Sequence, residues 1–174
     1  MIHKDIPVHK WFGANKTRRV TKFLVVHWPD APGWTPENLH KYLSTNRDRY
    51  AGIQDAIGID GEVYAYTDSS AVVYHCGGRV YTEEMRRRFP EFTENSFMST
   101  PNWCSWGVEV CHPEKDGKFT QASLDALRKL LAVRMKNYGL DIGDVYRHHD
   151  VTGKDCPRYF VQHPEEWQAF KESI

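Results

Sequence analysis

The chain has 174 residues, of which 40% are hydrophobic and 26% are charged, as in one folded domain with its own core. Lys plus Arg and Asp plus Glu each number 23, so the formal charge is zero and the basic excess usual in nucleic-acid binders is absent. No run approaches the roughly 18 apolar residues of a membrane span, and the N-terminal MIHKDIPVHKWFG lacks the apolar core of a signal peptide. We therefore expect neither nucleic acid nor a membrane as a partner.

The first half of the chain predicts a strand, a helix and a hairpin. The apolar run 23–26 predicts a buried strand with His27 at its carboxyl end, before a loop rich in Pro and Gly. In TPENLHKYLSTN, Thr35 is a candidate N-cap and Pro36 a candidate first helical residue. Asp60-Gly61 lies between two strand-like runs and predicts a hairpin turn.

The second half alternates short strands with helices. SWGVEVCH predicts a strand in which alternation places Glu109 on the face opposite its two valine neighbours. TQASLDALRKLLAVRMKNYG predicts a helix with a leucine stripe that ends at Gly139. DVYRHHD predicts a last short strand that carries His148 near its end, and HPEEWQAFKES predicts a helix that begins near Pro164. We expect an α/β (α+β) fold with a central mixed β-sheet flanked by helices.

Two features have ordinary interpretations. The run Arg86-Arg87-Arg88 is typical of a solvated helix end, and an anion site is the alternative. The four cysteines, at 76, 104, 111 and 156, show no regular spacing, which favours reduced thiols or a metal ligand over a disulfide scaffold.

The segment RHHDVTGKDCP, residues 147–157, collects several side chains that bind metals. Zinc prefers imidazole nitrogen and thiolate sulfur, and a catalytic site leaves one position open. His27, one histidine of this segment and Cys156 would supply two nitrogens and one sulfur, since a sheet brings strand ends together. Each residue alone has another interpretation: His27 as a hydrogen-bonded histidine at the rim of the sheet, and Cys156 as a small buried hydrophobe.

Four segments in the order LVVHW, YHCGG, WGVEVC and RHHDVTGKDCP resemble the zinc-dependent N-acetylmuramoyl-L-alanine amidase family. This family includes phage endolysin catalytic domains and is similar in fold to peptidoglycan recognition proteins. The resemblance spans residues 27–157. Its most specific part is a histidine eight residues before a Cys-Pro pair with a lysine two before the cysteine, which His148, Lys154 and Cys156 satisfy and His149 does not.

The resemblance implies a fold, a cofactor and a reaction. His27, His148 and Cys156 are the implied zinc ligands, and zinc activates a water for attack on the amide between the lactyl group of N-acetylmuramic acid and L-alanine. Lys154 is expected near the metal, where it helps to hold the developing oxyanion. His75 of YHCGG is expected in the groove wall in contact with substrate; the alternative is a rim histidine held by a backbone carbonyl.

One position departs from many relatives. Those relatives carry an aromatic residue followed by His on the strand before the Asp-Gly turn, whereas Ile53 and Gln54 stand here, so a tyrosine acid or base is not expected. Another phage subgroup carries a glutamate in a GIEI-like strand, which Glu109 matches. We expect Glu109 to be the general base; a solvated carboxylate on an edge strand is the alternative.

The sequence thus predicts a zinc-dependent peptidoglycan amidase in one catalytic domain, residues 1–174, with no cell-wall-binding module visible. The enzyme then consists of a catalytic domain alone, or this chain is the catalytic part of a longer protein. We expect a monomeric phage or prophage lysin, made in the bacterial cytoplasm and reaching the wall through a holin pore. Two other hypotheses stay open. One is a non-catalytic peptidoglycan-binding module of the same fold, although such relatives typically lack the cysteine ligand. The other is a metal-free protein in which Cys156 is the nucleophile and His148 its partner.

Overall fold

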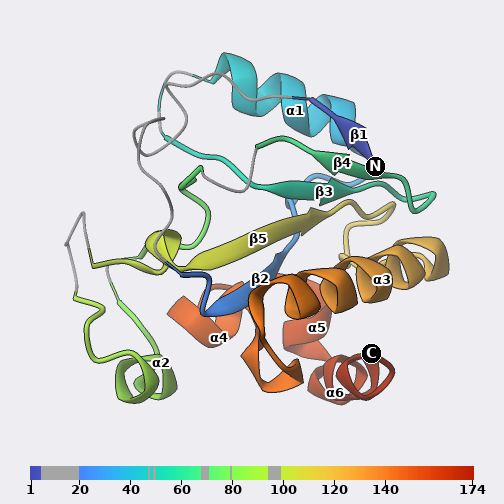
Figure 1. Cartoon of the computed structure of the whole chain (residues 1–174). Helices are drawn as coiled ribbons and strands as arrows, with labels where there is room; N and C mark the ends of the chain where they lie inside the picture. Colours follow the sequence, from blue (N-terminus) through green and yellow to red (C-terminus); the bar gives the residue numbers. More distant parts are fainter. Residues whose placement is uncertain (5–19, 47, 49, 68–70, 79, 94–98) are drawn as a thin grey trace.

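The computed structural model describes residues 1–4, 20–46, 48, 50–67, 71–78, 80–93 and 99–174 (Figure 1). In these ranges six strands form one sheet in the order β1-β4-β3-β5-β2-β6. The strands are β1 (Ile2–His3), β2 (Phe23–His27), β3 (Asp55–Ile57), β4 (Val63–Ala65), β5 (Ser105–Val110) and β6 (Val145–Arg147). Neighbours run parallel except β3 and β4, which pair antiparallel across the predicted hairpin, so the expected mixed sheet is confirmed.

Helices lie on both faces of this sheet. They are α1 (Pro36–Thr45), α2 (Glu83–Arg88), α3 (Gln121–Tyr138), α4 (His148–Thr152), α5 (Arg158–Gln162) and α6 (Pro164–Glu172), with the 3-10 helices η2 (Pro101–Trp103) and η3 (Ile142–Asp144). The predicted ends of α1 and α3 are confirmed: the Thr35 side chain accepts a hydrogen bond from the backbone N–H of Asn38, and Gly139 ends α3 at a φ of 66°. No helix of the described ranges is long and apolar enough to cross a membrane.

Alternation along the strands divides the core between the two faces. The side chains on one face of β2, β5 and β6 pack against α3, α5 and α6. Leu127 of α3 and Phe160 of α5 are buried in this part of the core. The opposite set includes Phe23 and Val25, which contact residues of α2 and α4, while α1 covers β3 and β4 (Figure 1). Each large apolar side chain buried in this way contributes about 1.5–3 kcal/mol.

A buried ion pair joins α3 to the sheet. The carboxylate of Asp55 on β3 is 0% exposed and accepts hydrogen bonds from Trp106 Nε1 at 2.5 Å and from the Arg134 guanidinium at 2.9–3.1 Å. The guanidinium also lies 4.4 Å from the Trp106 ring centroid. A carboxylate without these partners would be very costly to bury.

Strand register places the candidate residues at one edge of the sheet. His27 of β2 pairs with Glu109 of β5, and Val26 pairs with Arg147 of β6. Because Val26 and Val108 belong to the core under α3, alternation puts His27 and Glu109 together on the other face. The chain reaches His148 one residue after Arg147, at the same edge.

The predicted strand over DVYRHHD is wrong beyond Arg147, because His148 begins α4. The Asp150 carboxylate accepts a hydrogen bond from the Arg147 backbone N–H at 2.8 Å and several from its guanidinium, so this side chain turns the backbone into a helix. The arginine run does form a helix end: it is the last turn of α2, where Arg88 pairs with Asp144.

Candidate metal centre and active site

One side chain from β2 and two from the segment 147–157 meet at the carboxyl end of β2. The ligand atoms of His27, His148 and Cys156 all lie within 4.8 Å of one another. Cys156 Sγ lies 3.8 Å from His27 Nδ1, and the rings of His27 and His148 have centroids 4.7 Å apart at 72°. The structure therefore brings together the three residues that the sequence predicts as ligands.

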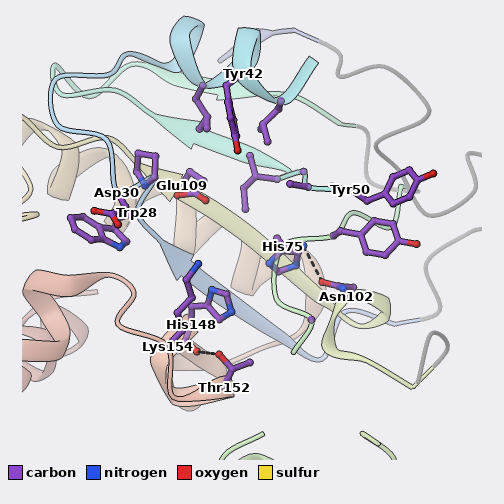
Figure 2. A pocket seen from close by; sticks show the side chains of 18 of the residues that line it. Trp28, Asp30, Tyr42, Tyr50, His75, Asn102, Glu109, His148, Thr152 and Lys154 are labelled. Atoms are coloured by element: carbon purple, nitrogen blue, oxygen red, sulfur yellow. Dashed lines mark hydrogen bonds between the residues drawn. The ribbon is translucent and has the colours of Figure 1, made fainter. Parts of the chain in front are cut away.

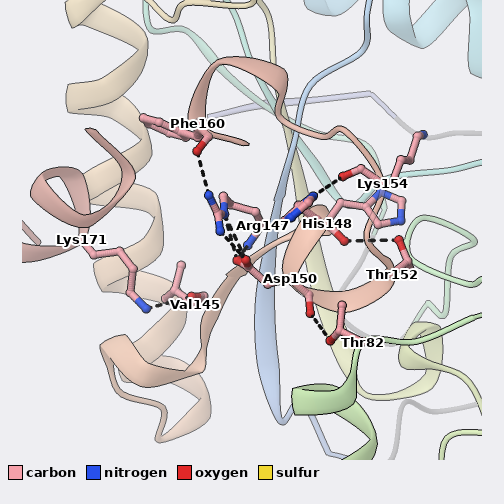
Figure 3. Close-up of polar contacts among 10 residues, drawn as sticks. Thr82, Val145, Arg147, His148, Asp150, Thr152, Lys154, Phe160 and Lys171 are labelled. Carbon is pink, nitrogen blue, oxygen red and sulfur yellow. Dashed lines mark hydrogen bonds and ion pairs between the residues drawn. The ribbon is translucent and has the colours of Figure 1, made fainter. Parts of the chain in front are cut away.

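Hydrogen bonds fix α4, which carries His148, against its surroundings (Figure 3). The Arg147 guanidinium bonds the Asp150 carboxylate and also donates to the Phe160 carbonyl at 2.7 Å. The Thr82 hydroxyl at the start of α2 donates to the Asp150 carbonyl at 2.6 Å. These contacts hold the first turn of α4 between α2 and α5.

The loop after α4 returns Cys156 to His148. The backbone N–H of His149 donates to the Cys156 carbonyl at 2.9 Å, and His149 Nδ1 lies 3.1 Å from the Lys154 carbonyl. Gly153 adopts a φ of 78°, a conformation that favours glycine, and its N–H donates to the His149 carbonyl. His149 thus closes the loop, while His148 faces the cluster.

Burial governs the electrostatics of the three residues. Burial lowers the pKa of His27 well below its usual value and lowers that of His148 to about 3, so both imidazoles are neutral, as metal ligands must be. Burial raises the pKa of the Cys156 thiol. A bound cation would reverse that effect, because coordination deprotonates a thiol.

The donor set fits zinc. His148 Nδ1 is buried and has no hydrogen-bond partner among the described residues, an arrangement that costs free energy unless another group engages it. Two neutral imidazoles and one thiolate, without a carboxylate, are the borderline-soft donors that zinc prefers. All four cysteines are buried, and none of them forms a disulfide bond.

A cavity of about 1040 Å³ opens above these residues (Figure 2). His148, Glu109, Lys154 and His75 line it, whereas His27 and Cys156, 2% and 1% exposed, lie beneath its floor. Aromatic side chains form much of its wall: Trp28, Trp34, Tyr42, Tyr50 and Tyr74. A group held in this cavity would meet His27, His148 and Cys156 from one side only.

Glu109 faces the cavity from β5. Its Oε2 is buried and has no hydrogen-bond partner among the described residues. Burial raises the pKa of this carboxyl to about 7, against the opposing attraction of the Lys154 ammonium. A carboxyl with a pKa near neutrality both accepts and returns a proton at physiological pH.

Lys154 extends from the exposed loop into the cavity beside His148 (Figure 2). Burial has the largest effect on the pKa of Glu109, His27 and His148. The positive charge of Lys154 opposes the rise in the pKa of Glu109 and adds to the lowering of both histidine pKa values. It supplies a cation at the mouth of the cluster, where a developing negative charge would need one.

His75 lies over β5 and touches both the cluster and the strand. Its Nδ1 is 3.0 Å from His27 Nε2, and its Nε2 is 3.0 Å from Ser105 Oγ. The backbone N–H groups of His75 and Cys76 both donate to Asn102 Oδ1, at 3.0 and 2.8 Å.

Sequence reasoning missed Asn102 and Ser105. The sequence does contain a pattern that could have found Ser105, since alternation along SWGVEV places it on the same face as Glu109. No such pattern indicates Asn102, which follows Pro101 in η2. Gln54 is fully buried, and its Oε1 accepts a hydrogen bond from the Gly107 N–H at 2.8 Å, so this side chain braces β5.

Comparisons with known proteins agree with this geometry. The family model described as N-acetylmuramoyl-L-alanine amidase matches residues 16–159. N-acetylmuramoyl-L-alanine amidase BlyA of Bacillus subtilis (strain 168) is 28% identical over 171 residues, which cover 97% of this chain and 45% of BlyA. The chain spans about half the length of the curated relatives that it matches.

Two solved structures share the fold: a mutant endolysin from Bacillus subtilis and the catalytic domain of XlyA. Each has a TM-score of 0.68 and 23% identity, and each match covers 99% of this chain and 97% of the other. The family match covers most of the chain, including all the residues that build the cluster. The chain belongs to the N-acetylmuramoyl-L-alanine amidase family.

Proposed function

We propose that this chain hydrolyses the amide bond between the lactyl group of N-acetylmuramic acid and L-alanine in bacterial peptidoglycan, with zinc as its cofactor. One observation carries the proposal: His27, His148 and Cys156 converge within 4.8 Å beneath a cavity that Glu109 and Lys154 line. The family supports the choice of bond, and the donor set supports the choice of metal.

His27, His148 and Cys156 would hold the zinc ion, and one donor would be the buried Nδ1 of His148, which has no hydrogen-bond partner in the described part of the chain. When bound, zinc would supply a Lewis acid that polarises the amide carbonyl and makes water nucleophilic near neutral pH. The loop that His149 closes keeps His148 and Cys156 in place beforehand, which lowers the cost of ordering the site.

Glu109 is the proposed general base. It would take a proton from the attacking water and pass it to the leaving amine, because an amide nitrogen leaves poorly unless it is protonated. Its buried, unpartnered Oε2 and its pKa of about 7 support this role. Gln54 cannot share the work, because an amide carries no transferable proton and its oxygen already binds Gly107.

Lys154 is the proposed stabiliser of the carbonyl oxygen as that atom gains negative charge. Its ammonium borders the cavity and acts electrostatically on Glu109 and His148, which supports this role. The sequence also predicts a substrate contact from His75, which lines the same cavity.

The cavity supports a substrate that is long and partly apolar. At about 1040 Å³ it lies at the upper end of the range for small-molecule sites, and stacked Tyr50 and Tyr74, with centroids 5.7 Å apart, form one wall. Such rings pack well against the apolar faces of a sugar or a peptide. A muramyl stem peptide has both parts.

We further propose that residues 1–174 are one catalytic domain that acts as a monomer. The near-complete overlap with the solved catalytic domain of XlyA supports a single folded domain. The fold shared with a solved endolysin supports a phage or prophage lysin that acts on the cell wall after holin-type release.

Metal analysis and chelation test the proposal. The purified protein should hold about one zinc per chain, lose activity on peptidoglycan when zinc is removed, and regain it when zinc is restored. Full activity in metal-free protein would contradict the proposal and favour a Cys156 nucleophile. Peptidoglycan binding without any release of product would favour the non-catalytic module.

A further inference from the structure

We propose that His75 is a positioning residue for the metal centre: its Nδ1 accepts a hydrogen bond from His27 Nε2–H, which leaves His27 Nδ1 as the atom that faces Cys156. The inference rests on the zinc site proposed above and deepens it. It assigns His75 a part in assembling the centre rather than in holding substrate.

A chain of hydrogen bonds from Pro101 to His27 determines which nitrogen of each imidazole ring carries the proton. The Ser105 hydroxyl donates its only proton to the Pro101 carbonyl at 2.6 Å, so its oxygen must accept from His75 Nε2–H at 3.0 Å. In its neutral form the His75 imidazole carries one N–H, which this hydrogen bond places on Nε2, so His75 Nδ1 is then an acceptor. His27 Nε2, 3.0 Å away, must then be the donor, and the lone pair of His27 lies on Nδ1.

The nitrogen that this count leaves unprotonated is the one nearer to the thiol. His27 Nδ1 lies 3.8 Å from Cys156 Sγ, within the cluster that also contains His148. The proton count and the distance to Cys156 Sγ are independent observations, and both indicate Nδ1 as the ligand atom of His27. Had the Ser105 hydroxyl lacked the Pro101 carbonyl, either tautomer would satisfy the same distances.

The surroundings of His75 hold its ring in this orientation. Asn102 Oδ1 accepts hydrogen bonds from two successive backbone N–H groups, those of His75 and Cys76. The ring lies against Gly107 of β5, where an added Cβ would come within 2.5 Å of His75 Nδ1. Gly107 thus provides the space that the ring occupies, and Figure 2 shows the Asn102 bond to the His75 segment.

A second interpretation of the same atoms is a second metal ion. His27, His75 and Cys76 also have ligand atoms within 4.8 Å of one another. That arrangement would require His27 to lose its Nε2 proton and bridge two ions. The 3.0 Å separation of the two nitrogens is the ordinary length of a hydrogen bond, which favours one ion and one orienting histidine.

Partners that orient a ligand histidine typically contribute 10–100-fold to metal affinity. His75→Ala should therefore weaken zinc binding by roughly 10–100-fold, measured by competition with a chelator of known affinity. His75→Asn places an acceptor oxygen near the position of Nδ1 and should restore most of the affinity. His163→Ala, a half-exposed histidine at the start of α6, is the control and should bind zinc as the wild type does.

Side-chain nitrogen NMR of the metal-free wild type gives a readout that needs neither zinc nor activity. His27 should appear as a neutral ring protonated on Nε2, and His75 as a neutral ring protonated on Nε2. A His27 ring protonated on Nδ1, or a doubly protonated His75, would overturn the inference. Thermal unfolding of each metal-free variant should stay close to the wild type, so that an affinity loss is not a folding loss.

The outcomes separate this inference from the proposed function. Unchanged zinc affinity in His75→Ala with a raised KM would make His75 a substrate contact, which overturns the inference and leaves the amidase intact. A second equivalent of zinc that disappears in His75→Ala would also overturn it. A wild type that binds no zinc would contradict the proposed function itself.

Discussion

Replacing Glu109 by Gln keeps the size of the side chain and removes its ability to carry a proton. If Glu109 is the general base, kcat on peptidoglycan should fall by roughly 10²-fold or more, the usual range for loss of acid–base catalysis. Zinc content should not change, because Glu109 is not among the three clustered ligand atoms. The variant therefore separates proton transfer from metal binding.

The same substitution should also change how the free energy of unfolding depends on pH, because Glu109 is buried. Burial raises the pKa of Glu109 from 4.5 to about 7, which corresponds to no more than roughly 3 kcal/mol, since Glu109 borders a cavity where water screens it. The unfolded carboxyl loses its proton near pH 4.5 and the folded one near pH 7. The contribution of Glu109 to the stability of the metal-free wild type should thus be lost as the pH rises through this window, so the stability of the wild type relative to Glu109→Gln should fall from pH 4 to pH 8.

The assay combines turnover at saturating peptidoglycan, zinc content, and urea unfolding of metal-free protein at pH 4 and pH 8. Glu114→Gln is the matched control, because Glu114 is an exposed glutamate in the loop after β5. It should change neither turnover nor the pH dependence of unfolding. A Glu109→Gln variant with near-normal turnover and bound zinc would refute the proposed base, and His75 or His149 would then be tested.

Four other substitutions and conditions follow from the same contacts. Cys156→Ser should lose zinc and activity together, because a neutral hydroxyl is a far poorer ligand than a thiolate; one retained equivalent of zinc in metal analysis would contradict this. Lys154→Ala should lower kcat by roughly 10²–10³ with little change in KM, because its ammonium acts on charge present only in the transition state; steady-state kinetics that show a change in KM alone would make Lys154 a substrate-binding residue. Arg134→Ala should lower the free energy of unfolding by roughly 3–5 kcal/mol, because the carboxylate of Asp55 is fully buried; a urea-unfolding loss below roughly 1 kcal/mol would refute this. Burial holds the pKa of His148 at about 3 against 6.5 when unfolded, so the stability of the metal-free wild type relative to His148→Gln should fall by roughly 2 kcal/mol from pH 7 to pH 5, and a stability difference that stays constant with pH would contradict it.

The sequence predicts the fold best where a local signal decides the structure. The apolar run before His27 forms β2, Thr35 and Pro36 begin α1, and Gly139 ends α3. Alternation along SWGVEV also predicts the face of Glu109 correctly. These signals need only neighbours a few residues apart, so a single sequence contains them.

An unusual local cap and contacts between distant residues explain what the sequence did not predict. α4 begins at His148 because Asp150 bonds the backbone N–H and guanidinium of Arg147, and arginine is not a usual capping residue. The neighbours of His75 are Ser105 and Asn102, about thirty residues away, and their hydrogen bonds depend on how the loop lies over β5. The spacing of His148 and Cys156 indicates a common site, but the closed loop between them appears only in the structure.

Identification of the new chain ends in digested peptidoglycan tests the central claim most directly. Zinc-loaded protein should release free amino groups on L-alanine and leave the glycan strands intact, and chelated protein should release none. Glycoside hydrolysis instead needs a carboxylate pair about 5–9.5 Å apart and would expose reducing sugar ends. New reducing ends without new L-alanine amino groups, or equal release by metal-free protein, would contradict the account.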